Sequence, residues 1–133
     1  MRLRITVPVR PLTDGEKRLF EILLHETFEG VEQLREQARY VRVVGTCGCG
    51  CRTIDLEVLN KANLSPYKGE ERVPVELELR GQDGCPILIL LHTKQGYLQE
   101  LEILRADGEA IVGLLPPEDA IRKARAKKNQ QGE

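Results

Sequence analysis

The first ten residues alternate between apolar and polar side chains, which is the pattern of a β-strand with one buried face. Leu3, Ile5 and Val7 are separated by arginine and threonine. A period of two places such side chains on one side of an extended chain. Pro8 has no amide hydrogen to donate to a neighbouring strand, so the pattern predicts a strand at the edge of a sheet.

The pattern changes to a helical period after residue 12. Thr13 is a good N-cap, and Glu16 stands three residues later, which is the spacing of a capping box. Leucine and phenylalanine residues then form one apolar stripe, and Gly30 is a typical helix end. A second, short helix is predicted from Val31 to Ala38, with apolar side chains on one side.

Strand patterns fill most of the chain after residue 40. Segments 54–58 and 73–79 alternate between apolar and polar residues, whereas 86–91, PILILL, is continuously apolar and is typical of a strand covered on both faces. Short turns separate these segments, which favours antiparallel neighbours. We therefore predict an α+β fold, with one or two N-terminal helices packed on a curled, mostly antiparallel sheet of about six strands.

Residues 1–120 are predicted to form a single domain, since no linker or repeat divides them. A chain of 133 residues is long enough for one hydrophobic core. The remaining residues, 121–133, are basic and polar, and we interpret them as a C-terminal tail that can fray.

Composition excludes several classes of function. The net charge is −1, so the chain has no surplus of lysine and arginine. A nucleic-acid-binding protein needs such a surplus to displace counterions. No apolar run approaches the roughly 20 residues of a membrane-spanning helix. The N-terminus has no unbroken apolar stretch of the kind found in secretory signals, so we expect a cytoplasmic protein whose thiols stay reduced.

Three of the four cysteines alternate with glycine in the segment GTCGCGC, and the fourth, Cys85, stands alone in DGCP. In a fully extended chain Cys47 and Cys51 would lie about 13 Å apart. Two sulfur ligands of one zinc ion lie no more than about 4.6 Å apart. The chain must therefore curl if all three cysteines bind one ion, and the glycines permit that curl.

Three interpretations of this segment stay open: a compact turn of small residues, a zinc site, or redox-active thiols in a small enzyme. Zinc signatures usually contain two separated pairs such as CxxC, so the turn is the leading interpretation. As a zinc site, it would use Cys47, Cys49, Cys51 and Cys85, with His92 and then His25 as alternatives for the fourth ligand.

Glutamates alternate with apolar residues on the predicted strands. Such a face is usually a solvated side of a sheet, but it can also support acid–base chemistry or bind a basic partner. The sequence contains no nucleotide-binding loop and no nucleophile-elbow motif. Our leading hypothesis is a non-catalytic interaction or accessory protein, which presents this acidic face to a protein partner or to a second copy of itself. The glutamates concerned are Glu57, Glu76, Glu78, Glu100 and Glu102.

Two stretches resemble a family of small uncharacterised bacterial proteins with a Gly-Cys-rich hairpin. They are VRVVGTCGCGC followed by TIDLEV, and GYLQELEILRADGEAI running to LLPPED. The resemblance covers most of residues 13–120. It implies no activity, substrate or site residue, so it leaves the function unknown.

Overall fold

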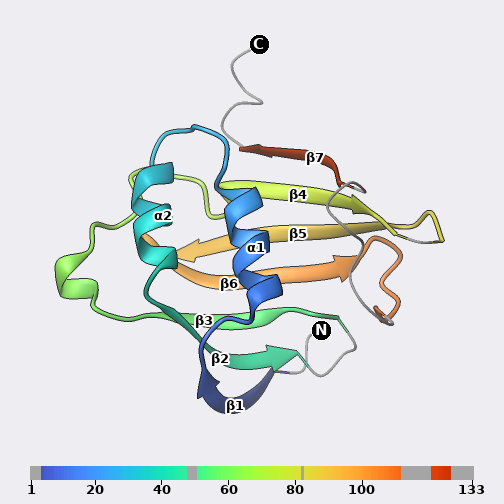
Figure 1. Cartoon of the computed structure of the whole chain (residues 1–133), viewed down its shortest axis with the longest axis horizontal. Coiled ribbons are helices and arrows are strands. Elements are labelled where there is room, and N and C mark those ends of the chain that lie inside the picture. Colours follow the sequence, from blue (N-terminus) through green and yellow to red (C-terminus); the bar gives the residue numbers. More distant parts are fainter. Residues whose placement is uncertain (1–3, 48–50, 82, 112–120, 127–133) are drawn as a thin grey trace.

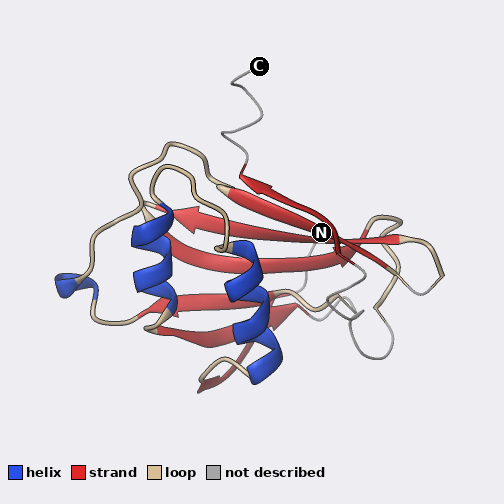
Figure 2. Cartoon of the chain, turned by 45° about the horizontal axis from the view of Figure 1, so that its top comes forward, coloured by secondary structure: helices blue, strands red, loops and turns tan. Residues whose placement is uncertain are grey.

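The computed structural model describes residues 4–47, 51–81, 83–111 and 121–126. Seven strands form one sheet in the order β1-β2-β3-β6-β5-β4-β7, and neighbouring strands are antiparallel (Figure 1). Two helices lie side by side on one face of this sheet (Figures 1 and 2). The elements are β1 (Arg4–Arg10), α1 (Asp14–Leu23), α2 (Val31–Ala38), β2 (Val41–Cys47), β3 (Ile54–Val58), the 3-10 helix η1 (Lys61–Asn63), β4 (Val75–Arg80), β5 (Pro86–Lys94), β6 (Tyr97–Arg105) and β7 (Ile121–Ala126).

The predicted α+β fold with a curled sheet of about six strands is wrong. The described chain is mainly β, because α1 and α2 have only 10 and 8 residues whereas β5 and β6 alone have 9 each. The sheet is open and uncurled, since its outer strands β1 and β7 do not pair with each other. The period of the apolar residues located the helices and strands. It could not show whether the two edge strands would pair with each other and close the sheet. Pro8 correctly predicted that the first strand is an edge strand.

Helix α1 begins with the predicted capping box. The amide of Glu16 donates to Thr13 Oγ1 at 3.1 Å, and the amide of Thr13 donates to Glu16 Oε1 at 2.9 Å. Arg10 also donates to both carboxylate oxygens of Glu16, at 2.9 and 3.0 Å. Burial would raise the pKa of Glu16, but the hydrogen bonds from Arg10 and Thr13 outweigh it and lower that pKa. The network fixes the start of α1 against the end of β1.

The end of α1 differs from the prediction. The helix stops at Leu23, well before Gly30. Gly30 instead precedes α2 with a positive φ of 88°, a conformation that glycine adopts at little cost. The side chain of Arg35, on α2, donates to the carbonyls of Leu24 and His25. This contact satisfies carbonyl groups that follow the last turn, and local sequence gave no sign of it. The predicted range of α2 is confirmed.

The core lies between the helices and the inner face of the sheet. On β5, Ile87, Ile89 and Leu91 are buried, and they alternate with residues that are only partly buried. Burial of each such side chain contributes roughly 1.5–3 kcal/mol of transfer free energy. Leu88 and Leu90 therefore lie on the face opposite the helices and are only partly buried, so the prediction that PILILL is covered on both faces is not confirmed in the described residues.

Strand β7 comes from the segment that composition suggested as a tail. Ile121–Ala126 pairs with the outer edge of β4, where Arg125 stands opposite Glu76 and Lys123 opposite Glu78. Basic positions thus lie beside acidic positions of the neighbouring strand, which is a favourable cross-strand arrangement. Residues 127–133 lie outside the described residues, so the domain boundary near residue 120 stays a prediction.

Candidate functional site

Three of the cysteines lie at one end of the sheet. Cys47 ends β2, Cys51 lies in the bend before β3, and Cys85 lies in the turn between β4 and β5. These three cysteines are partly buried, and Cys49 lies outside the described residues. Strand β6 lies between β3 and β5, so the two turns are separated laterally by two strand spacings, about 10 Å. The strand order alone does not place the sulfur atoms, so the zinc site of Cys47, Cys49, Cys51 and Cys85 stays a prediction.

Neither histidine lies in the segments that contain the cysteines. His25 is exposed beside the helices, and the side chain of His92 is paired with Glu102. Among the described residues, no group of three or more histidine, cysteine or acidic side chains is arranged to hold a metal ion. The zinc hypothesis, with Cys47, Cys49, Cys51 and Cys85 as ligands, stays a prediction.

Some glutamates of the predicted acidic face lie beside a histidine or basic positions of the same chain. His92 Nε2 lies 2.7 Å from Glu102 Oε1, and His92 stands opposite Glu100 in the β5–β6 register. Glu76 and Glu78 stand beside the basic positions of β7. The side chains of His92 and Glu102 are only 16% and 25% exposed. Three of the glutamates predicted to meet a partner, Glu76, Glu78 and Glu102, therefore lie beside basic positions or a histidine of the same sheet.

A groove of about 690 Å³ lies between α1 and α2. Its apolar floor consists of buried residues that include Leu12, Phe20 and Val41. Helix α1 and the residue after it line the groove at positions 17, 20, 21 and 24, and α2 and the residue after it line the groove at 35, 38 and 39. These spacings of three and four place each set on one side of its helix. The groove is thus bounded by two helical stripes.

The rim of the groove is predominantly basic. Lys17, Arg35, Arg39 and His25 line it together with a single acidic residue, Glu21. Arg18 donates to Glu21 at 2.8 Å, so that carboxylate already has a cationic partner. Lys17 makes no ion pair with any residue of the described ranges. The groove therefore favours an anionic occupant.

Arg35 holds the two walls of the groove together. Its Nε donates to the carbonyl of Leu24 at 2.8 Å, and its Nη2 donates to the carbonyl of His25 at 3.2 Å. A cation at the C-terminal end of a helix also interacts favourably with the helix dipole. Because α1 and α2 are connected in this way, the groove is present before any partner binds.

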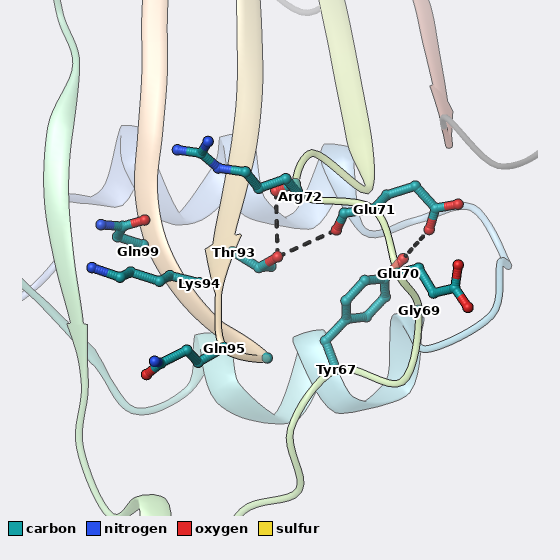
Figure 3. A pocket seen from close by; sticks show the side chains of 10 residues that line it. Tyr67, Gly69, Glu70, Glu71, Arg72, Thr93, Lys94, Gln95 and Gln99 are labelled. Atoms are coloured by element: carbon teal, nitrogen blue, oxygen red, sulfur yellow. Dashed lines mark hydrogen bonds between the residues drawn. The ribbon is translucent and has the colours of Figure 1, made fainter.

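A second pocket, of about 580 Å³, lies at the end of the sheet opposite the cysteines (Figure 3). Tyr67 and Thr93 are buried at its base. The hydroxyl of Tyr67 donates to Glu71 Oε1 at 3.0 Å, and the hydroxyl of Thr93 donates to the carbonyl of Arg72 at 3.3 Å. Burial, followed by the neighbouring Glu71 carboxylate, raises the pKa of Tyr67, so this phenol stays protonated at neutral pH.

The base of this pocket is held by Gln37, which is fully buried on α2. Its Nε2 donates to the carbonyls of Ser65 and Gly96 at 3.0 and 2.9 Å, and its Oε1 accepts from the amide of Leu98 at 3.0 Å. The amide of Tyr67 donates to the carbonyl of Gly96 at 2.7 Å. Three segments that are distant in sequence are thus joined by one side chain.

Sequence reasoning missed both the groove and this pocket. The only signal for Gln37 was its position three residues after Leu34, on the side of α2 that carries the apolar residues. From the sequence alone, we would expect solvated charges at Lys17, Arg35 and Arg39. The apolar period of each helix does not show how far apart the two helices lie, so it does not predict a groove between them.

The model of one protein family, described as a domain of unknown function (DUF6984), matches residues 9–115. The chain belongs to DUF6984. The matched part of the DUF6984 domain contains both helices and β2 to β6, and hence the groove and the pocket. Membership agrees with the uncharacterised family expected from the sequence and assigns no function. Comparison with curated proteins and with solved structures gave no match. No helix in the described ranges is both long enough and apolar enough to span a membrane.

Proposed function

We propose that this DUF6984 domain is a non-catalytic interaction module that binds a protein partner in the groove between α1 and α2. The observation that supports this most directly is the combination of a buried apolar floor with a basic rim. An elongated groove between helices is a common site for peptide recognition, where apolar anchors provide affinity and charges provide specificity. The acidic sheet face is the weaker candidate, because part of it lies beside basic positions and a histidine of the same chain.

The occupant that fits best is an acidic amphipathic helix. Residues 17–24 define a groove wall of about 10 Å, which is roughly two helical turns at 1.5 Å per residue. Apolar side chains at positions i, i+3 or i+4, and i+7 of a bound helix would cover the floor. Flanking aspartates and glutamates would then meet Lys17, Arg35 and Arg39, whereas a basic helix would be repelled.

Selection from a random peptide library displayed on phage tests this proposal even though the partner is unidentified. The wild-type domain should enrich peptides that carry a net negative charge and apolar residues at helical spacing. The variant Lys17→Glu/Arg39→Glu should not enrich them. The matched control is Lys68→Glu/Arg80→Glu, which makes the same charge changes at positions outside the groove.

Affinity of the best peptide, measured by fluorescence anisotropy, makes the test quantitative. The groove variant should bind at least about tenfold more weakly, which corresponds to about 1.4 kcal/mol, and the control should match the wild type. Enriched peptides that bind all three proteins equally would refute the groove as the site.

Two other occupants are distinguishable outcomes. Binding of dodecanoate that disappears in the groove variant, without any enriched peptide, would assign the groove to anionic amphiphiles. Concentration-dependent dimerisation that disappears in the same variant would assign it to a second copy of the chain.

The finer expectations from the sequence remain part of this proposal. We keep as parts of this proposal the bacterial origin that the resemblance implies and the cytoplasmic location expected from the sequence. Zinc binding through the glycine–cysteine turn remains the alternative function.

A further inference from the structure

We propose that the pocket in Figure 3 is a second, independent binding site, for a short peptide with free amino and carboxyl termini. The inference does not depend on the groove, which lies between the helices and shares no lining residue with this pocket. It depends on how the charges around the pocket are distributed.

Charges of opposite sign lie on opposite sides of the pocket. Arg72, Lys94 and Gln99 project to one side, whereas Glu70 and Glu71 lie on the other (Figure 3). The first set offers two cations and an amide donor, which suit a carboxylate. The second set offers carboxylates, which suit an ammonium group.

These charges do not neutralise one another directly. The side chains of Glu70, Arg72 and Lys94 form no ion pair and no hydrogen bond with other residues of the described chain, although all three line one pocket. The space between the two sides therefore keeps them apart. A ligand with a positive and a negative end would satisfy both sides at once.

The separation of the two sides selects the length of the ligand. In a single α-amino acid the two charged groups are attached to one carbon, whereas the termini of an extended tripeptide lie about 10 Å apart. A tripeptide therefore suits charges on opposite sides of a pocket of about 580 Å³ better than a single amino acid does. Peptides also carry backbone amides, which Gln95 and Gln99 can bind through hydrogen bonds.

The base of the pocket is rigid enough to act as a site. Tyr67 is fixed by its backbone bond to Gly96 and by its hydroxyl bond to Glu71. A Cβ atom at Gly69 would overlap the hydroxyl group of Tyr67, so glycine permits this close approach of the chain. Preorganised groups reduce the cost of binding a small ligand.

The experiment is a titration of trialanine followed by NMR chemical shifts of the pocket amides, with two capped peptides for comparison. N-acetyl-trialanine lacks the ammonium group, and trialanine amide lacks the carboxylate. Saturable binding of trialanine is expected, and each cap should weaken binding at least about fivefold, or about 1 kcal/mol. Absence of saturable shifts, or equal binding of all three peptides, would overturn the proposal.

Two variants match each ligand group to its side of the pocket. Lys94→Gln should weaken binding of trialanine but leave binding of trialanine amide unchanged, and Glu70→Gln should show the corresponding behaviour with N-acetyl-trialanine. Lys68→Gln and Glu32→Gln, both outside the pocket lining, are the matched controls. If the controls weaken binding as much as the pocket variants, the proposal fails.

A final arm separates this site from the groove. The groove variant Lys17→Glu/Arg39→Glu should bind trialanine with the affinity of the wild type. Loss of trialanine binding in that variant would contradict an independent site.

Discussion

The two ends of the sheet are held together by different kinds of interaction. At one end, the buried amide of Gln37 makes three hydrogen bonds to backbone groups of Ser65, Gly96 and Leu98. At the other end, Arg105 bridges Asp83 and Asp107 on the surface, at 2.9 and 2.6 Å. If the buried amide is lost, no water can replace its hydrogen bonds to the backbone. If the exposed ion pair is lost, its charges are solvated instead. Short distances alone therefore do not rank the two ends by stability.

The largest effect is expected at the buried end. Gln37→Leu keeps a side chain of similar size but leaves the Leu98 amide and the Ser65 carbonyl without this partner. We expect a loss of about 3 kcal/mol in the free energy of unfolding, because each unsatisfied buried group costs roughly 1–3 kcal/mol. Urea denaturation measures this loss.

The control for that variant is on the same helix. The side-chain oxygen of Gln33 is buried and accepts no hydrogen bond from the described residues. Gln33→Leu should therefore leave stability unchanged or increase it slightly. Equal losses in both variants would mean that packing on α2, and not the hydrogen bonds of Gln37, determines the effect.

A smaller effect is expected where the same end meets the pocket. Tyr67→Phe removes the hydroxyl bond to Glu71 and should cost about 1 kcal/mol at neutral pH. Because the folded-state pKa of Tyr67 is raised, wild-type stability is complete below the ordinary tyrosine pKa of about 10 and falls as pH rises above it. Tyr67→Phe has no phenol at this position to ionise, so this part of the fall in stability above about pH 10 should be absent. Chemical denaturation at a series of pH values tests the difference, and parallel profiles would contradict the assignment.

An ion pair with a half-buried partner lies between the two extremes. Arg10 and Thr13 lower the pKa of Glu16, so the contribution of this carboxylate is present above the ordinary glutamate pKa of about 4.3 and is lost as pH falls through its folded-state pKa. Glu16→Gln should cost under about 1 kcal/mol at neutral pH. The stability difference from wild type should shrink on acidification, and a constant difference would show that the charge is irrelevant.

The surface end should respond least, and only when salt is low. Hydrogen bonds from Arg105 lower the pKa of Asp107, but both groups are accessible to solvent. Arg105→Ala should reduce the melting temperature measurably at an ionic strength of about 0.01 M and hardly at all at about 1 M, where the Debye length is about 3 Å. A loss that is independent of salt would show that Arg105 acts through packing.

Substitution of Cys85, which lies in the turn at the same end of the sheet as Arg105, should have no measurable effect. Because β6 separates its turn from Cys51, Cys85→Ser should change neither the stability nor the zinc content of the purified protein. Elemental analysis measures the zinc content, with Cys49→Ser for comparison. A zinc ion that is lost in both variants would show that Cys85 and the segment containing Cys49 share it.

Local features could be predicted from the sequence, and non-local ones could not. Thr13 and Glu16 identify the start of α1 because a capping box involves residues three apart. Pro8 identifies an edge because the missing amide is a property of the residue itself. The end of α1 depends on Arg35, eleven residues beyond Leu24, so no local rule could find it.

The candidate site was harder to predict for the same reason. The groove requires α1, α2 and Val41 of β2 to meet, and the pocket requires the segment around Tyr67 to meet the turn between β5 and β6. Cysteines and glutamates attracted attention because their chemistry is evident from residue type. Gln37 did not, since an amide on a short polar helix is ordinary until its burial is known.

Strand β7 has a practical consequence for anyone who shortens this protein to the family boundary. A chain that ended at residue 115 would lack Ile121–Ala126, and the outer backbone groups of β4 would lose their partner. An uncovered strand of this kind recruits extended segments from other molecules. Light scattering should therefore reveal clustering of the shortened chain but not of the full-length one, if the last strand protects β4 from other molecules.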